Sequence, residues 1–133
     1  MKKVITYNDK GLPNGFLLEL QKDGEKTTAY LTCVRMSCFK GYHLHKRRIA
    51  NYVCIQGAVL VITYHKENDK WIRKEKHLIE GDEYQIGINI PTGLSCTGFE
   101  DAWIVNFPSP AYDPNDKDEQ VEYTQEQLEQ EPR

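Results

Sequence analysis

The stretch FKGYHLHKRRIANYVCIQGAVLVITY, residues 39–64, contains two runs of the kind that form β-strands. Residues 51–56 and 58–65 are rich in β-branched and aromatic side chains, and Gly57 between them indicates a turn. Comparable runs occupy residues 16–20, 27–36, 84–90 and 102–107, and residues 63–74 turn through Asn68 and Asp69. Short strands at this spacing, without a long helical period, predict an all-β antiparallel sandwich or barrel. The apolar residues expected in its core are Val53, Ile55, Val59, Val61, Ile88 and Ile104.

The length of the chain and its uneven charge predict one domain with a distinct end. The 133 residues fit a single domain, residues 1–133. Residues 113–133 carry a net charge of −6, whereas the rest of the chain carries +3. We expect residues 121–133 to form an acidic, mobile tail, in which residues 125–131 can form a helical turn.

Composition excludes several classes of protein. No run of eighteen apolar residues is present, so we expect no membrane partner. The N-terminal MKKVITYNDKG has no apolar segment of the signal-peptide kind, which predicts a cytoplasmic protein with reduced cysteines. No two cysteines form a CxxC pair, so a zinc knuckle is not expected. A charge of +3 outside the tail is too weak to predict a nucleic-acid partner but is compatible with a small anionic ligand.

Two of the four histidines of the chain lie one residue apart, in the sequence HLHKRR. Alternate side chains of a strand face the same side, so His43 and His45 are predicted to point together. An imidazole titrates near neutral pH, which suits acid–base chemistry. The cations Lys46, Arg47 and Arg48 that follow are typical of a solvated turn, but beside two histidines they also suit an anionic ligand.

A glycine, His-x-His, a short spacer, a strand and a second glycine together resemble the first sequence motif of the cupins. IPTGLSC, residues 90–96, resembles the second motif, Pro-x-Gly-x-x-His, except that Cys96 stands at the histidine. The resemblance implies an antiparallel cupin (jelly-roll) barrel that forms a homodimer. Metal-binding cupins also carry a Glu in the first motif, where this chain has Ala50 or Asn51. We therefore expect no metal and no other cofactor.

A closer resemblance covers residues 39 to about 120. Residues 39–64 are similar to the first motif of short proteins related to dTDP-4-dehydrorhamnose 3,5-epimerase and of dTDP-4-keto-6-deoxyhexose 3,4-ketoisomerases. NIPTGLSCTGF and IVNFPSPAYDPNDKDE resemble the later motifs of the epimerase-related proteins. The resemblance implies an isomerase in deoxysugar or surface-polysaccharide biosynthesis. It would epimerise a nucleotide-linked, dTDP-type 4-keto-6-deoxy sugar after a histidine removes the proton next to the ketone.

The same resemblance implies roles for individual residues. His43 stands at the position of the family's base, His45 assists it, and Tyr112 either supplies a proton or packs at the cavity mouth. The residues implied in substrate binding are Lys40, Lys46, Arg47, Arg48, Asn51 and Cys96. The larger epimerases have a tyrosine that acts as the acid where this chain has Asn106 or its neighbours, so the resemblance implies an incomplete set of groups for double epimerisation. Two alternatives therefore stay open: a 3,4-ketoisomerase acting on the same class of substrate, and a non-catalytic or metal-binding cupin that binds a small ligand.

Overall fold

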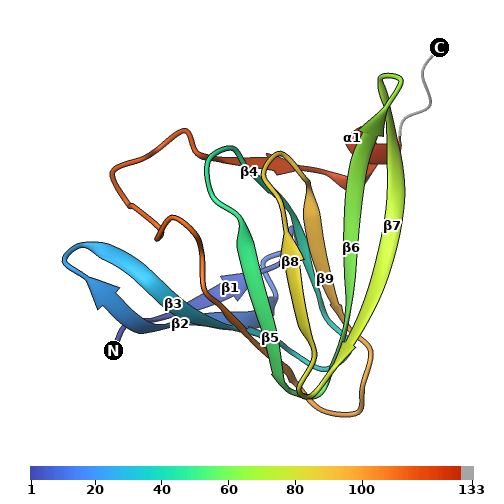
Figure 1. The fold of residues 1–133 in the computed structure, drawn as a ribbon. Helices are drawn as coiled ribbons and strands as arrows, with labels where there is room; N and C mark the ends of the chain where they lie inside the picture. The colour runs from blue at the N-terminus through green and yellow to red at the C-terminus, as the bar shows by residue number, and fades with distance from the viewer. Residues whose placement is uncertain (130–133) are drawn as a thin grey trace.

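The computed structural model describes residues 1–129 as two antiparallel β-sheets that face each other (Figure 1). The first sheet has six strands in the order β1 (Lys3–Tyr7), β2 (Pro13–Asp23), β3 (Lys26–Val34), β10 (Ala102–Asn106), β5 (Ala50–Gln56) and β8 (Glu83–Ile86). The second has five strands in the order β11 (Gln120–Tyr123), β4 (Phe39–His45), β9 (Thr92–Cys96), β6 (Ala58–Glu67) and β7 (Lys70–Ile79). The predicted all-β antiparallel architecture is confirmed for these residues.

The β5–β6 connection forms as the sequence predicts. Gly57 adopts a φ of +73°, a backbone conformation that L side chains rarely occupy. A Cβ at this position would also lie 2.8 Å from the carbonyl oxygen of Asp101. The turn therefore requires glycine, and it sends the chain from the six-stranded sheet into the five-stranded one.

The main hydrophobic core lies between the two sheets. It includes Val59, Val61 and Ile104, which are fully buried as predicted. The prediction is wrong for Ile55 and Ile88, which are 41% and 46% exposed. In β5 the buried core residues are Ala50 and Cys54, so Ile55, which follows Cys54, points to the other face of the sheet.

The C-terminal segment is paired and packed where the sequence predicts a mobile tail. Strand β11 pairs with β4 in continuous antiparallel register, from Gln120 opposite His45 to Tyr123 opposite Tyr42. The short helix α1 (Gln125–Glu129) then buries Leu128, which is 2% exposed and packs against Tyr42. In Figure 1 this red segment runs along β4 and ends beside β6. The expected helical turn is thus present over residues 125–129, while residues 130–133 lie outside the described part of the chain.

The single-domain boundary stays a prediction. Within residues 1–129, no helix combines the length and apolarity that crossing a membrane requires.

Candidate active site

A cavity of about 540 Å³ opens between the two sheets. Strand β4 of the five-stranded sheet contributes His43 and His45 to its wall. Strands β3 and β5 of the six-stranded sheet contribute Tyr30 and Tyr52. The cavity thus has imidazoles on one wall and phenols on the wall formed by the other sheet.

Strand β4 presents three polar side chains to this cavity because its pairing with β9 is irregular. The register between the two strands shifts between Lys40 and His43. Such a bulge changes which residues face a given side, so Lys40 lines the cavity together with His43 and His45. The predicted common orientation of the two histidines is confirmed, whereas Tyr42, which directly precedes His43, packs against α1 on the other face.

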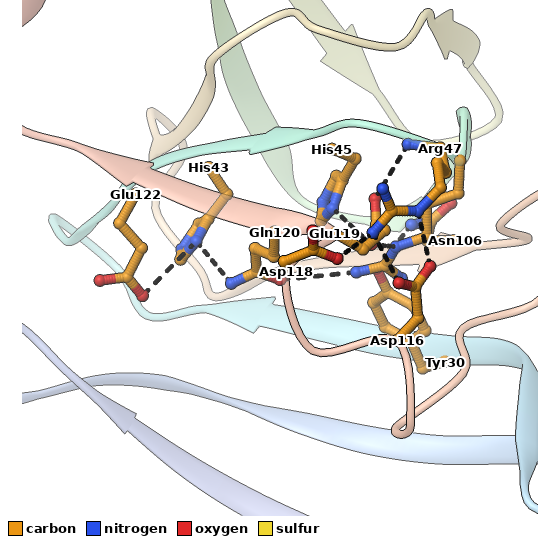
Figure 2. Close-up of polar contacts among 11 residues, drawn as sticks. Tyr30, His43, His45, Arg47, Asn106, Asp116, Asp118, Glu119, Gln120 and Glu122 are labelled. Atoms are coloured by element: carbon orange, nitrogen blue, oxygen red, sulfur yellow. Dashed lines mark hydrogen bonds and ion pairs between the residues drawn. The ribbon is translucent and has the colours of Figure 1, made fainter.

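His43 lies between two side chains of β11, as Figure 2 shows. Its Nδ1 atom is 2.9 Å from Nε2 of Gln120 and 3.8 Å from Oε1 of Glu122. Burial lowers the pKa of His43, and the carboxylate of Glu122 opposes this only in part. The imidazole is therefore neutral at pH 7.

His45 lies beside a buried ion pair. Its Nδ1 atom is 3.3 Å from Oε1 of Glu119, and that oxygen accepts a 2.6 Å hydrogen bond from Nε of Arg48. Glu119 and Arg48 are both buried, at 5% and 6% exposure. Burial and the nearby Arg48 lower the pKa of His45, while Glu119 acts in the opposite direction. This imidazole is also neutral at pH 7.

Lys40 is a buried cation, 9% exposed, whose Nζ donates a 3.2 Å hydrogen bond to the carbonyl oxygen of Phe16. Burial lowers its pKa to about 8. Strand β2 approaches closely here, because a Cβ on Gly15 would lie 1.8 Å from the carbonyl oxygen of Cys33 and 3.0 Å from Cε of Lys40. Among residues 1–129, no ion pair neutralises Lys40. An anionic or carbonyl ligand in the cavity would meet a donor that lacks a charged partner.

Arg48 and Tyr112 are the other predicted site residues that line the cavity. The guanidinium carbon of Arg48 lies 4.8 Å from the centre of the Tyr112 ring. This is a cation–π arrangement. Tyr112 is 37% exposed, which fits a position at the mouth of the cavity.

The predicted cluster of Lys46, Arg47 and Arg48 does not point into the cavity as a unit. Arg47 points away from the cavity and binds Asp116, with its Nε 2.8 Å from Oδ2, and also contacts Asp118. It lines a separate pocket of about 120 Å³, while Lys46 is exposed and lines neither pocket. The structure therefore leaves Arg48, of these three cations, as the one that lines the cavity.

Asn51 and Cys96 also lie outside the cavity wall. Residues 46–49 bend between β4 and β5, so the alternation does not carry over, and in β5 it is Ala50 and Tyr52 that line the cavity. The amide nitrogen of Asn51 donates to the carbonyl oxygen of Phe107 at 2.8 Å. Cys96 belongs to the hydrophobic core, with its Sγ 3.1 Å from the carbonyl oxygen of Glu100. Both predicted substrate contacts are thus absent from this arrangement.

Sequence reasoning did not find four residues of the site, namely Tyr30, Tyr52, Glu119 and Gln120. Each tyrosine lies in a predicted strand, but the sequence does not say which face of the strand points into the cavity. Only the packing of the two sheets shows that both tyrosines face the histidines. Glu119 and Gln120 stand in the acidic segment, where nothing local distinguishes a buried carboxylate from a solvated one. Only the pairing of β11 with β4, which places these residues beside the histidines, identifies them as part of the site.

Comparisons with solved structures identify the fold. The sequence matches no protein-family model and no curated protein. The structure is similar to CapF, a capsular polysaccharide assembling protein from Staphylococcus aureus, with a TM-score of 0.71 and 15% identity over 90% of this chain and 34% of CapF. It is similar to oxalate decarboxylase from Lactobacillus farciminis, with a TM-score of 0.65 and 13% identity over 82% of this chain and 31% of that one. It is also similar to CENP-C of Drosophila melanogaster bound to CAL1, with a TM-score of 0.62 and 12% identity over 80% of this chain and 76% of that one.

These similarities show that the chain has the antiparallel cupin jelly-roll fold. The chain spans about a third of the length of CapF and of the oxalate decarboxylase.

The cupin fold often carries a metal ion, and the donor set of this chain does not fit one. Ala50 lines the cavity where metal-binding cupins have a donor, and Cys96 is in the core. The Nδ1 atoms of His43 and His45 already face side chains from the C-terminal segment. Among residues 1–129, no three His, Cys, Asp or Glu side chains are grouped so that they could hold an ion. We therefore derive no step through a metal.

Proposed function

We propose that this chain is an isomerase that epimerises a nucleotide-linked, dTDP-type 4-keto-6-deoxy sugar next to its ketone. The observation that carries the proposal is the facing arrangement of neutral imidazoles and phenols in one cavity. A base and an acid on opposite walls are what inversion at a carbon requires, since the proton leaves one side and returns on the other.

The chemistry of the substrate matches the groups on the histidine wall. A proton on the carbon next to a ketone is acidified, because the resulting negative charge is shared with the carbonyl oxygen. A neutral imidazole is a suitable base for it near pH 7, and such a base typically contributes about 10² to 10⁴ in rate. His43 is the principal base that the sequence predicts, and His45 is its partner.

The opposite wall supplies a proton donor. The hydroxyl oxygen of Tyr30 accepts a 2.7 Å hydrogen bond from Nδ2 of Asn106, as Figure 2 shows. Its own O–H therefore remains available to donate into the cavity. Tyr30 can thus take the place of the tyrosine that the larger epimerases have near Asn106. Tyr112 at the cavity mouth is the predicted alternative donor.

Cations in the cavity support binding of an anionic keto sugar. Lys40 and Arg48 offer N–H donors, which stabilise negative charge that develops on an enolate oxygen or is present on a phosphate. A volume of about 540 Å³ is in the range of small-molecule sites. The open side leaves room for the nucleotide to extend out of the cavity.

The comparisons are compatible with a place in carbohydrate metabolism, because CapF assembles a capsular polysaccharide. We extend this to the present chain only as part of the proposal, together with a cytoplasmic location and a homodimer. The outer face of the six-stranded sheet carries partly exposed apolar residues, among them Phe16, Leu18 and Trp103. A second copy of the chain covering this face would double the mass measured by light scattering.

A 3,4-ketoisomerase is the second candidate, favoured by the position of both histidines on one strand face. One imidazole can take a proton from one carbon while the other returns a proton to the neighbouring carbon on the same side, and the hydroxyl proton of the first carbon passes to the oxygen of the former ketone. The carbonyl then moves, and no donor on the opposite wall is needed.

The test is NMR of dTDP-4-keto-6-deoxy sugars incubated with the protein in D₂O. An epimerase incorporates deuterium with inverted configuration next to an unmoved ketone, whereas a ketoisomerase moves the ketone. The control is the double variant His43→Asn/His45→Asn, which should incorporate no deuterium above the background. If the wild-type protein also fails to exchange any proton across the panel, the enzyme proposal is wrong and a ligand-binding cupin replaces it.

A further inference from the structure

We propose that Glu119 and Gln120 hold the two histidines in opposite tautomers, which makes His45 the base and His43 the hydrogen-bond donor. The inference rests on the proposed function for its chemical meaning, but the tautomers themselves are a property of the free protein. It reverses the roles that the sequence predicts, in which His43 is the principal base.

Arg48 fixes the orientation of the Gln120 side-chain amide. A guanidinium nitrogen of Arg48 lies 3.4 Å from Oε1 of Gln120. Arginine has only donors, so the amide oxygen must face it. Turning the amide over would bring its NH₂ group against the N–H groups of Arg48. Arg48 therefore keeps the amide nitrogen of Gln120 on the side of His43.

The orientation of the Gln120 amide sets the tautomer of His43. The amide nitrogen of Gln120 is 2.9 Å from Nδ1 of His43, and an amide nitrogen only donates. Nδ1 must then be the acceptor, and the neutral ring carries its proton on Nε2. Glu122 does not oppose this assignment, because its carboxylate is 3.8 Å away and its side chain is 77% exposed to water. His43 thus offers an N–H group for chemistry.

Glu119 sets the opposite tautomer for His45. Its Nδ1 atom is buried and has no hydrogen-bond partner among residues 1–129, and Oε1 of Glu119 lies 3.3 Å from it. Glu119 is held ionised by Arg48, and its other oxygen accepts a 3.4 Å hydrogen bond from the backbone N–H of Arg47. A lone pair on Nδ1 would face a negative oxygen, so the proton resides on Nδ1. The Nε2 atom of His45 is then a free base.

The two tautomers divide one chemical step between them. Nε2 of His45 takes the proton from the carbon next to the ketone, and the electrons of that C–H bond form the C=C bond of an enolate. The carbonyl π electrons move to the oxygen, which accepts a hydrogen bond from Nε2–H of His43. Glu119 then faces an imidazolium, whose charge it stabilises. Glu119 and Gln120 are positioning residues, since they act through the imidazoles.

The test is nitrogen-15 NMR of the imidazole rings in the protein at pH 7.5, without any substrate. The chemical shift of each ring nitrogen distinguishes a protonated nitrogen from a bare one. We expect protonated Nε2 in His43 and protonated Nδ1 in His45. Gln120→Glu should move the proton of His43 to Nδ1, because a carboxylate there requires a donor. The matched control Glu122→Gln should leave both tautomers as they are. A wild-type His43 with its proton on Nδ1, or a wild-type His45 with its proton on Nε2, overturns the inference even if no variant folds.

Deuterium exchange separates this inference from the proposed function. With an active substrate, His45→Asn should reduce the rate of C–H exchange at least 10²-fold, and His43→Asn should reduce it less. The inference is overturned if His43→Asn abolishes exchange while His45→Asn retains it. If the tautomers are as stated but no keto sugar exchanges a proton, the tautomer assignment stands and the proposed function fails.

Discussion

Replacing Lys40 by methionine removes a buried ammonium group while keeping a side chain of similar length. In the folded protein, burial lowers the pKa of this lysine from 10.5 to about 8. The unfolded chain therefore binds more protons than the folded chain between about pH 8 and 10.5. The stability of the wild type should rise with pH across this window, and below about pH 8 the full cost of burying the charge is present.

The size of the effect follows from the two pKa values. A difference between 10.5 and about 8 corresponds to roughly 3 kcal/mol of unfolding free energy, of which about 1 kcal/mol is recovered between pH 7 and pH 9. The Lys40→Met variant has no ammonium group that titrates in this range. At pH 7 we expect the unfolding free energy of the variant to be at least as large as that of the wild type. Between pH 7 and pH 9 the unfolding free energy of the wild type should rise by about 1 kcal/mol relative to that of the variant.

The assay is urea unfolding at pH 7 and pH 9, followed by tryptophan fluorescence. Burial raises the pKa of Cys33 and Cys54 above the ordinary value of 9.0, so unfolding also responds to thiol ionisation around pH 9. Both thiols are present in the variant and in the wild type, so taking the difference between the two proteins limits this contribution. Lys46→Met is the matched control, because it removes an exposed lysine that is hydrated in both states. An equal difference between Lys40→Met and wild type at both pH values would refute the reasoning.

Three further predictions test the packing of the site. Leu128→Ala should lower the unfolding free energy by about 3 kcal/mol in urea titrations, because it leaves a cavity under α1; a loss within experimental error would mean that the helix does not pack there. Arg48→Ala should lower the unfolding free energy by about 3–5 kcal/mol, because it leaves Glu119 buried and unpaired, and it should also raise KM. Arg47→Ala should change the unfolding free energy and KM far less. Similar effects of the two variants would contradict the finding that Arg48, and not Arg47, lines the cavity. Cys96→Ala should keep the rate of substrate C–H exchange within about twofold of wild type, since Cys96 lies in the core; a loss of tenfold or more would return the thiol to the site.

Local pattern predicted much of the molecule correctly. The turn between β5 and β6 follows from Gly57 and the β-branched runs on either side, because strand propensity and turn geometry act over a few residues. The common face of His43 and His45 follows from the two-residue period of a strand, which holds within β4. These features need only their neighbours in sequence, so they could be predicted.

The same alternation failed where the strand is interrupted. Counting from His45 to Asn51 keeps the parity, but residues 46–49 bend, and Asn51 therefore points away from the cavity. Ile55 is exposed for the same reason, since it shares a face with Asn51. A bend of this kind is decided by packing, and the sequence of the turn does not reveal how many residues it consumes.

The sequence by itself determined an all-β chain with a histidine pair on one strand face. Only the tertiary structure decided what those histidines meet. Gln120 lies 77 residues from His43 along the chain, and Glu119 lies 71 residues from Arg48. The pairing of β11 with β4 brings these groups together, and it is stabilised by backbone hydrogen bonds and by the burial of Leu128. Contacts at such separation carry no local sequence pattern, because each depends on the packing of the whole barrel.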